Sequence, residues 1–476
     1  MIKSPDLNPF QALLLRVGHA NKFQYQIYAV FALKWLIAGL FLMSLNFLFL
    51  TEEFTCTEEE APKDFCKEWV CQHSEEFWKL HLKNPPRSLA YEFEWYVCGR
   101  EWVVSLTQSM MYLGSFTGYV TLPFIADNFG RKRSEMISWL IAVFGIVTLS
   151  TSMSMAQAGI GLFFCGMGIN TAINLHYTFL KEFVIGHTKE IMIITLQIMF
   201  SLGVLLTALL AMYVPNWRIA CVAFFAIPIV LLLYGYVYIE ETPEFNLSKG
   251  YNVLLESMNR IATTNERPLL TMEDIEEELK NYTAPEESRL GVWSLFRYKS
   301  LRLTTYCCGF VHMAVEFIYD GTLFNLNRVG LSVYTNQMVV AAAEMVASLY
   351  CNFVVPRLKR KSYTIICLSL VGVLLLLTAF IGTLKEGNYA IAELGVMIAM
   401  RFMLSSLWGF YFVYLTELYP CEITTISIGY MNAVGALAAT ASPYIKLAAK
   451  SWSMVIMAGM SFVAAGHVAC LRETKG

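Results

Sequence analysis

Long apolar runs recur along the chain and are separated by short polar segments. A helix that crosses a lipid bilayer needs about 20 mostly apolar residues, and twelve runs approach or reach that length. They lie near residues 24–50, 102–125, 136–156, 158–182, 190–213, 217–239, 302–324, 334–356, 363–384, 389–416, 424–446 and 450–470. Two longer polar stretches, 51–101 and 240–300, interrupt the pattern. The pattern predicts an all-α membrane protein with twelve transmembrane helices.

Composition supports this class and argues against several others. Of 476 residues, 56% are hydrophobic and 15% are charged, and the mean hydropathy is +0.50. A soluble domain carries roughly 25% charged residues. The formal net charge of −2 argues against nucleic-acid binding, which needs a basic surface. The sequence contains no Walker loop and no HExxH, GxSxG or CxxC motif. We therefore expect no enzyme activity, no cofactor and no metal site.

The distribution of basic residues predicts the orientation in the membrane. Short cytosolic loops are rich in Lys and Arg. Two such loops follow the second and the eighth span, with Arg131, Lys132 and Arg133 in one and Arg357, Lys359, Arg360 and Lys361 in the other. We therefore place residues 1–23 and the central polar loop 240–300 on the cytosolic side, and loop 51–101 on the opposite side. The first span has no cleavage site after it, so we interpret it as a retained helix.

Loop 51–101 also holds a cluster of cysteines. Its members are Cys56, Cys66, Cys71 and Cys98. Several cysteines in one non-cytosolic loop predict disulfides and an oxidising compartment. The alternative is that they are free thiols, and the connectivity cannot be deduced from spacing.

The chain also repeats itself. The segment YTFLKEFVIG, with Leu180 and Glu182, matches FVYLTELYPC, with Leu415 and Glu417. Aligning the two segments also superposes the two basic loops. This repeat predicts an N-terminal half, residues 24–239, and a C-terminal half, residues 301–476, with six helices each. Two such parallel halves around a midplane site are typical of secondary transporters.

Several short motifs indicate the family to which the chain is similar. They are VGHANKFQ, VCGREWVVSLTQSMMYLGSFTG, ADNFGRKR, ETPEFNLSKG and ELYP, in this order from residue 16 onward. With them the chain resembles the major facilitator superfamily, and within it a divergent member of the organic cation/anion/zwitterion transporter family. The resemblance covers about residues 16–445.

The resemblance implies a conformational latch at the cytosolic ends of the helices. Its candidates are Asp127, Gly130, Arg131, Lys132, Glu182, Glu241 and Glu417. In similar proteins, carboxylates and arginines pair across the two halves and stabilise one access state. Here Asn128 and Thr424 stand where the family has arginine, and Pro356 stands where it has aspartate. We therefore expect several carboxylates to have lost their partners and one access state to dominate.

Ionisable residues inside spans are costly and indicate function. His312, Glu316 and Asp320 are spaced by four and share one helical face. The resemblance retains Glu344, Arg401 and Tyr414, whereas Ala436 replaces the charged residue of the eleventh span. The full set of cavity candidates is Lys34, Asn170, Asn174, His312, Glu316, Asp320, Glu344, Glu393, Arg401, Tyr414 and Ala436. These residues form either a polar cavity with a carboxylate–histidine relay for a proton or cation, or charge pairs that hold helices together or meet a partner subunit. For Asn170 and Asn174 we favour interhelical hydrogen bonding.

Two functions follow. The leading one is a secondary transporter that moves a small organic solute across the bilayer by alternating access. The alternative is a homologue without transport activity that serves as a structural subunit of a larger membrane complex, for example in mitochondria. Ala436, the incomplete latch and the lack of an Asn-x-Ser/Thr site in loop 51–101 favour the alternative. The missing site also favours an intracellular organelle over the plasma membrane.

Overall fold

The structure is a computed structural model. It describes residues 9–50, 88–93, 99–214, 216–221, 230, 234–235, 239–280, 292–326, 332–354, 357–384, 389–419 and 421–474. All regular structure within these ranges is helical. The predicted disulfide cysteines Cys56, Cys66, Cys71 and Cys98 lie outside the described residues, as does most of the predicted span 217–239.

The long helices coincide with the predicted spans. In the first part of the chain they are α2 (Lys22–Leu48), α6 (Glu101–Phe129), α7 (Arg131–Ser150), α8 (Met155–Phe183) and α9 (His187–Tyr213). In the second part they are α15 (Lys299–Phe324), α16 (Val333–Val354), α17 (Arg360–Ile381), α18 (Ala390–Leu418), α19 (Cys421–Ala439) and α20 (Lys450–Ala469). Of these described helices, seven are long and apolar enough to cross a membrane, namely α2, α7, α8, α9, α17, α18 and α20.

One predicted span is shorter than expected. The span 424–446 was predicted as one helix, but α19 ends at Ala439 and a separate 3₁₀ turn, η5 (Ser442–Leu447), follows. Pro443 stands at the start of this turn. Because proline lacks an N–H donor and clashes with the preceding turn, it stops an α-helix. The break lets η5 pack against α6 and α15.

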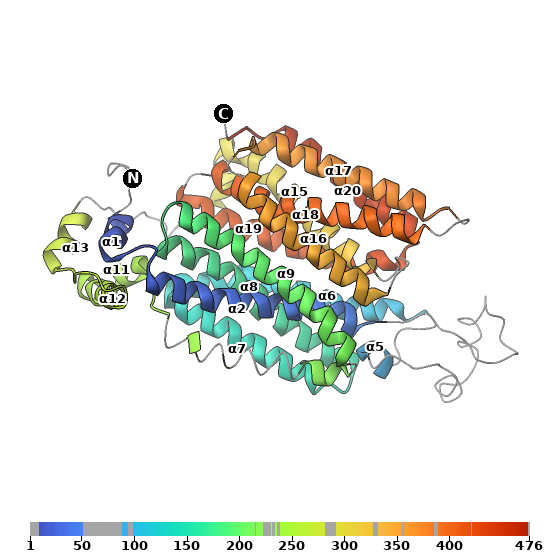
Figure 1. The fold of residues 1–476 in the computed structure, drawn as a ribbon, viewed down its shortest axis with the longest axis horizontal. Helices are drawn as coiled ribbons and strands as arrows, with labels where there is room; N and C mark the ends of the chain where they lie inside the picture. The colour runs from blue at the N-terminus through green and yellow to red at the C-terminus, as the bar shows by residue number, and fades with distance from the viewer. Residues whose placement is uncertain are drawn as a thin grey trace, which may run out of the picture.

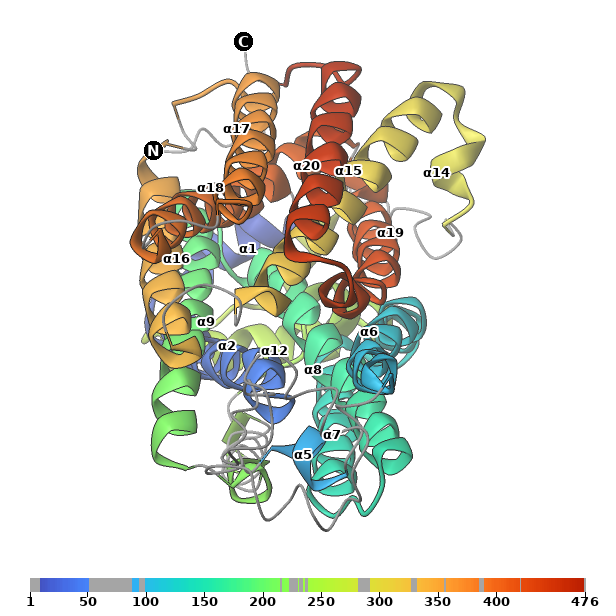
Figure 2. The ribbon, with the colours of Figure 1, turned by 90° about the vertical axis from the view of Figure 1, so that its right-hand side faces the viewer.

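The helices form two bundles. The first bundle comprises α2 and α6 to α9, and the second comprises α15 to α20 with η5. The bundles meet where α9 packs against α16 and α6 packs against α19 (Figures 1 and 2). We call the end that carries α1 (Pro9–Val17) and α12 (Tyr251–Thr264) the near end. The opposite end, which carries α5 (Leu89–Glu92), is the far end (Figure 1).

Glycines let the helices of the first bundle approach closely. A Cβ on Gly114 of α6 would collide with the backbone of Phe163 of α8, and one on Gly166 of α8 would collide with the backbone of Met111 of α6. Small residues at such crossings drive helix association in membranes, where lipid provides no hydrophobic force between helices. The close approach of the α6 and α8 backbones at these glycines is therefore typical of helices that pack together in a membrane.

Apolar side chains also point outward from the bundles. Along α17 the exposed residues are Ile366, Leu370, Val373, Leu377 and Phe380, which are spaced by three or four. The buried residues of the same helix, such as Leu368 and Leu375, face the interior. A helix that is apolar on both its inner and outer faces suits a lipid environment. The chain is therefore a multi-pass membrane protein.

A layer of short helices covers the near end. Within the predicted central loop, the described helices are α11 (Pro243–Lys249), α12, α13 (Met272–Leu279) and α14 (Ser294–Arg297). Asn265 ties this layer to the start of α2, because its Oδ1 accepts from the backbone N–H of Phe23 (2.8 Å). Arg16 of α1 pairs with Asp274 and Glu278 of α13, each at 2.7 Å. The described part of this segment is thus largely helical.

Candidate functional site

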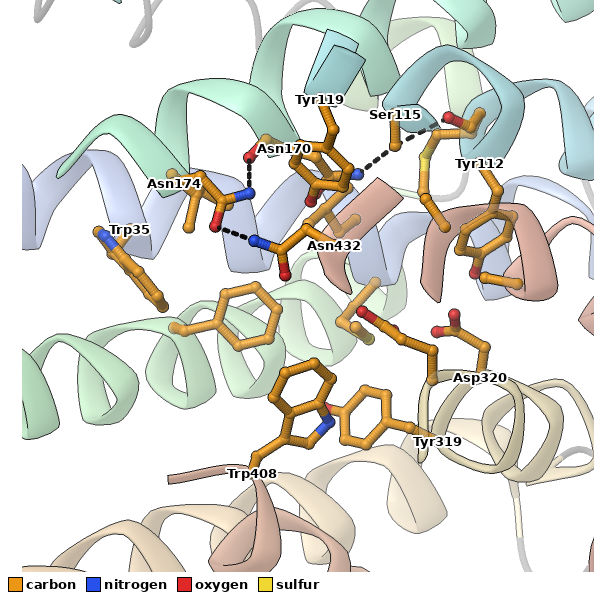
Figure 3. A pocket seen from close by; sticks show the side chains of 18 of the residues that line it. Trp35, Tyr112, Ser115, Tyr119, Asn170, Asn174, Tyr319, Asp320, Trp408 and Asn432 are labelled. Atoms are coloured by element: carbon orange, nitrogen blue, oxygen red, sulfur yellow. Dashed lines mark hydrogen bonds between the residues drawn. The ribbon is translucent and has the colours of Figure 1, made fainter. Parts of the chain in front are cut away.

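A cavity of about 180 Å³ lies between the two bundles (Figure 3). Its wall from the first bundle includes Trp35, Tyr112, Ser115, Tyr119, Asn170 and Asn174. Its wall from the second bundle includes Glu316, Tyr319, Asp320, Trp408, Asn432 and Ala436. Five residues predicted from sequence therefore line one cavity, namely Asn170, Asn174, Glu316, Asp320 and Ala436.

Side-chain amides link the bundles along this wall. Asn432 of α19 donates from Nδ2 to Oδ1 of Asn174 on α8 (3.0 Å). The Asn174 amide donates to the backbone carbonyl of Asn170 (3.4 Å), and Asn170 donates to the Ser115 hydroxyl of α6 (2.6 Å). Figure 3 shows this chain of hydrogen bonds above the cavity. Asn170 and Asn174 thus make the interhelical bonds expected of them and also border the cavity.

The opposite wall is acidic. Glu316 and Asp320 lie one turn apart on α15, and both line the cavity. The Glu316 side chain is 24% exposed, whereas His312, one turn earlier, is fully buried. Nε2 of His312 lies 4.0 Å from the Glu316 carboxylate, and its ring packs edge-on against Trp408. His312 therefore contacts Glu316 and Trp408, which line the cavity, but does not line the cavity itself.

Arg401 and Glu344 form a second group of charged residues, and both bind Tyr319. Nη1 of Arg401 on α18 lies 3.8 Å from Glu344 of α16, and both side chains are buried. The Tyr319 hydroxyl donates to Glu344 (3.1 Å), while the Tyr319 carbonyl accepts from Arg401 (3.1 Å). The guanidinium also lies 4.4 Å from the centre of the Tyr319 ring. Arg401 and Glu344 thus position a cavity residue without lining the cavity themselves.

Three other candidates lie away from the cavity. Lys34 of α2 pairs with Glu135 of α7, and Glu135 also contacts Nε2 of His176 on α8 (3.0 Å). Glu393 pairs with Lys450. The Tyr414 hydroxyl donates to the carbonyl of Arg472 (2.6 Å). These residues hold helices together, and Glu135 and His176 were not singled out from sequence.

At the near end of the first bundle, Glu241 caps α7. Its carboxylate accepts from the backbone N–H groups of Arg131 (2.9 Å) and Lys132 (3.2 Å). Gly130 precedes α7 with φ of +96°, and a Cβ there would collide with Glu241. Burial raises the pKa of Glu241, although these N–H bonds favour its charged form. Arg131 also pairs with Glu182 at the end of α8 (3.5 Å).

The second bundle repeats this arrangement. The carboxylate of Glu473, which follows α20, accepts from the backbone N–H groups of Arg360 (2.8 Å) and Lys361 (3.2 Å) at the start of α17. Arg360 pairs with Glu417 near the end of α18 (3.2 Å). Glu473 is a functional candidate that we did not predict from sequence.

Two latch candidates make ion pairs within their own bundles. Glu182 and Glu417 each pair with the arginine that starts a helix of the same bundle. The predicted latch runs across the two halves, so the predicted loss of its arginine partners stays a prediction. Asp127 lies in the last turn of α6, and its side chain is outside the part of the chain that the structure describes.

Hydrogen bonds between the bundles gather at the far end. Ser109 of α6 donates to the carbonyl of Thr440 (2.6 Å), and Ser105 donates to that of Pro443 (3.0 Å). Lys446 of η5 donates to Gln108 of α6 (2.5 Å). The described ion pairs of Arg131 and Arg360 at the near end each stay within one bundle. The three hydrogen bonds of the far end join the bundles on that side of the cavity, and the bond between Asn432 and Asn174 joins them along its wall.

Comparison with protein families gives a match over most of the chain. Residues 30–476 match the model of the family described as "Sugar (and other) transporter". Among curated relatives, Solute carrier family 22 member 6 of mouse is 24% identical over 407 residues, which cover 84% of this chain and 74% of that protein. Solute carrier family 22 member 1 of cattle is 27% identical over 406 residues, which cover 83% and 69%.

Solved structures share the fold. The proton:xylose symporter XylE of the major facilitator superfamily, bound to 6-bromo-6-deoxy-D-glucose, matches with a TM-score of 0.68 and 15% identity, covering 95% of this chain and 97% of that one. The partially occluded inward open conformation of the xylose transporter XylE from E. coli matches with a TM-score of 0.69 and 15% identity, covering 95% and 99%.

Proposed function

Because the chain belongs to the sugar (and other) transporter family of the major facilitator superfamily, we propose that it is a secondary transporter that moves a small organic solute by alternating access. The resemblance to organic ion transporters that the motifs suggested is confirmed by the family match and by the solute carrier relatives. The cavity between the bundles is the proposed solute site.

The proposed architecture has two six-helix halves, residues 24–239 and 301–476. Residues 1–23 and 240–300 then lie on the cytosolic side, and 51–101 lies opposite. The two bundles and the basic starts of α7 and α17 at the near end support this arrangement. Labelling single cysteines with an impermeant reagent tests it. Equal accessibility at residues 260 and 75 from one side would contradict it.

One observation carries the transport proposal. The cavity lies between two bundles that hydrogen bonds such as the one from Ser109 to Thr440 join at the far end. Alternating access requires that such contacts break while contacts form at the other end. Hydrogen bonds of this kind contribute only about 0.5–1.5 kcal/mol each, so a bound solute can shift the balance between the two states.

A cross-link across the far end tests this mechanism. Cysteines introduced by Ser109→Cys and Thr440→Cys stand where the two bundles touch. In proteoliposomes, oxidation of this pair should arrest solute exchange, and reduction should restore it. Each single variant, treated in the same way, is the control for oxidation of other thiols. Exchange that continues at full rate after complete cross-linking would refute alternating access.

The alternative function is a structural subunit of a larger complex. It is favoured by a latch that is incomplete across the two halves, and the pairs of Glu182 and Glu417 stay within one bundle each. However, the cavity is lined by both bundles, which a purely structural subunit does not require. Migration of the native protein as part of a large assembly, together with absence of exchange, would favour the alternative.

Two finer predictions remain part of the proposal. Disulfides among Cys56, Cys66, Cys71 and Cys98 would stabilise loop 51–101 by restricting its unfolded state. A non-reducing mass map that finds only free thiols would refute them.

An intracellular organelle membrane stays our preferred location, because loop 51–101 carries no Asn-x-Ser/Thr site. Surface biotinylation of intact cells distinguishes this location from the plasma membrane.

A further inference from the structure

We propose that the short helix α14 and the start of α15 form a binding surface for the headgroup of an anionic phospholipid. This α14–α15 surface comprises Trp293, Arg297, Tyr298, Lys299 and Arg302. We place the lipid in the leaflet at the near end, which is the cytosolic side in the proposed orientation. The inference concerns the outside of the second bundle and does not depend on transport through the cavity.

Packing fixes α14 against the second bundle. Leu295 is fully buried, and its carbonyl accepts from the Thr305 hydroxyl of α15 (3.4 Å). The Phe296 ring packs edge-on against Tyr306 of α15 and Tyr430 of α19, with ring centres 5.5 and 5.4 Å apart. Figure 2 shows α14 at the periphery of this bundle, beside α15. The side chains of α14 that do not pack inward are thus held at the outer surface of the protein.

One exposed face of α15 changes from basic to apolar along the helix. Lys299, Arg302, Leu303 and Tyr306 have the spacing of three, four and seven residues that places side chains on one helical face, and all four are exposed. Leu303 is 60% exposed and Tyr306 is 61% exposed. On a predicted membrane span, exposed side chains of this kind face lipid. The two basic residues therefore lie where the helix passes from lipid to water.

The basic side chains of the α14–α15 surface carry charge that the described residues do not balance. Arg297, Lys299 and Arg302 are all exposed, and none of them forms an ion pair with a residue that the structure describes. Arg302 donates from Nε to the carbonyl of Phe296 (2.9 Å), which is a neutral partner. Arg16, in the same near-end layer, instead pairs with two carboxylates. A phosphate group would complement the unbalanced charge, because charged hydrogen bonds to phosphate are strong.

The aromatic side chains favour a lipid over a soluble anion. Trp293 is 83% exposed and Tyr298 is 51% exposed, and both lie close to Arg297 in the chain. Trp and Tyr gather at the membrane–water interface, because their rings are apolar and each carries one polar group. A free phosphate offers these rings no apolar surface to contact. Cytosolic leaflets carry anionic lipids that attract basic segments next to a membrane helix. The combination therefore fits a phospholipid headgroup.

Native mass spectrometry of the purified full-length protein tests the inference. The probes are dioleoylphosphatidylserine, which is anionic, and dioleoylphosphatidylcholine, which has no net charge. The test variant combines Arg297→Gln, Lys299→Gln and Arg302→Gln. The matched control removes the same charge from exposed residues of the near-end layer by combining Lys249→Gln, Arg267→Gln and Lys280→Gln.

We expect phosphatidylserine to bind more tightly than phosphatidylcholine. Its affinity should fall about fivefold for each basic residue removed from the α14–α15 surface, and the control variant should bind it as the unchanged protein does. Unfolding temperatures show whether each variant is folded. If the triple variant is unstable, the double variant Arg297→Gln with Lys299→Gln replaces it, because it keeps the bond from Arg302 to Phe296.

Three other outcomes would overturn the inference. An equal loss of phosphatidylserine in the test and control variants would show attraction by net charge and no binding surface at α14. Equal binding of the two lipids, or no binding of phosphatidylserine, would exclude an anionic headgroup as the occupant. Displacement of phosphatidylserine by millimolar inorganic phosphate would identify a soluble anion in place of the lipid. The transport proposal is tested separately by the cross-link across the far end.

Discussion

The two bundles are alike at the near end and different in the middle of the membrane. In each bundle a carboxylate, Glu241 or Glu473, caps the helix that begins with the basic motif. In each bundle the arginine of that motif also pairs with a glutamate at the end of another helix. We infer that a feature present in both bundles serves what they have in common, namely the way their helices pack at this end.

The charges in the middle are only partly repeated, because the second bundle has a buried pair, Arg401 with Glu344, and also two acidic residues at the cavity. In the first bundle Lys34, Glu135 and His176 are almost fully buried and bind one another. In the second bundle Glu316 and Asp320 face the cavity. We infer from this difference that the first cluster stabilises its bundle, and we propose that the acidic wall borders the solute site. The predictions below test this division, beginning with the largest expected effect.

Lys34→Met should destabilise the protein most. It leaves Glu135 buried beside His176 without its lysine, and removing one partner of a buried pair costs about 3–5 kcal/mol. Unfolding in detergent, followed by tryptophan fluorescence, measures the loss. The control is the double variant Lys34→Met with Glu135→Leu, in which both charges are absent and much of the stability should return. A stable single variant would contradict a structural role for the cluster.

Glu241→Ala and Glu473→Ala should have similar, smaller effects. Each removes a carboxylate that accepts backbone N–H groups at the start of a helix. Loss of such a cap costs about 0.5–2 kcal/mol. The two unfolding free energies, measured under the same conditions, should agree within about 1 kcal/mol. A large effect at one position only would show that the two near ends are not equivalent.

The sequence predicted the positions of most helices along the chain, but not which face of each helix meets the cavity. Hydrophobic runs place α2 and α17 well, because a bilayer demands about 20 apolar residues per crossing. Arg401 and Glu344 were predicted to line the cavity, yet Tyr319 stands between them and it. Which face of a helix meets a cavity depends on packing against several neighbours. The period of one helix does not contain this information.

Contacts between residues that are far apart in the chain could not be predicted from the sequence pattern either. Glu473 caps a helix that begins 113 residues earlier in the chain. Glu135 stands at the edge of a predicted span and was not considered as a partner of Lys34. Both pairings depend on how distant helices approach each other. Local spacing identified Glu316 and Asp320, because two members of one helical turn can be recognised without the fold.

Glu316→Gln should stabilise the protein slightly in the absence of solute. The Glu316 carboxylate lines the cavity and is mostly buried, so its neutral amide avoids part of the desolvation cost. We expect a gain of about 1 kcal/mol or less, opposite in sign to the effect of Lys34→Met. Thermal unfolding of the solute-free protein measures it. A loss as large as that of Lys34→Met would make Glu316 structural and remove the contrast between the bundles.

The smallest expected effect concerns pH and the carboxylate cap of the first bundle. Burial raises the pKa of Glu241 above its usual value of 4.5. An acid that binds its proton more tightly when folded stabilises the protein fully below its unfolded pKa and loses that contribution as pH rises through the folded value. The contribution of Glu241 to stability should therefore decline from about pH 4.5 upward.

The variant Glu241→Gln tests this. It keeps an oxygen that can accept the N–H bonds but cannot titrate, so the decline of stability with pH should be shallower. Glu276→Gln, which removes an exposed carboxylate of α13, is the matched control, and unfolding temperatures from pH 4.5 to 8 decide the comparison. An unchanged slope in Glu241→Gln would show that this carboxyl is not the source of the decline.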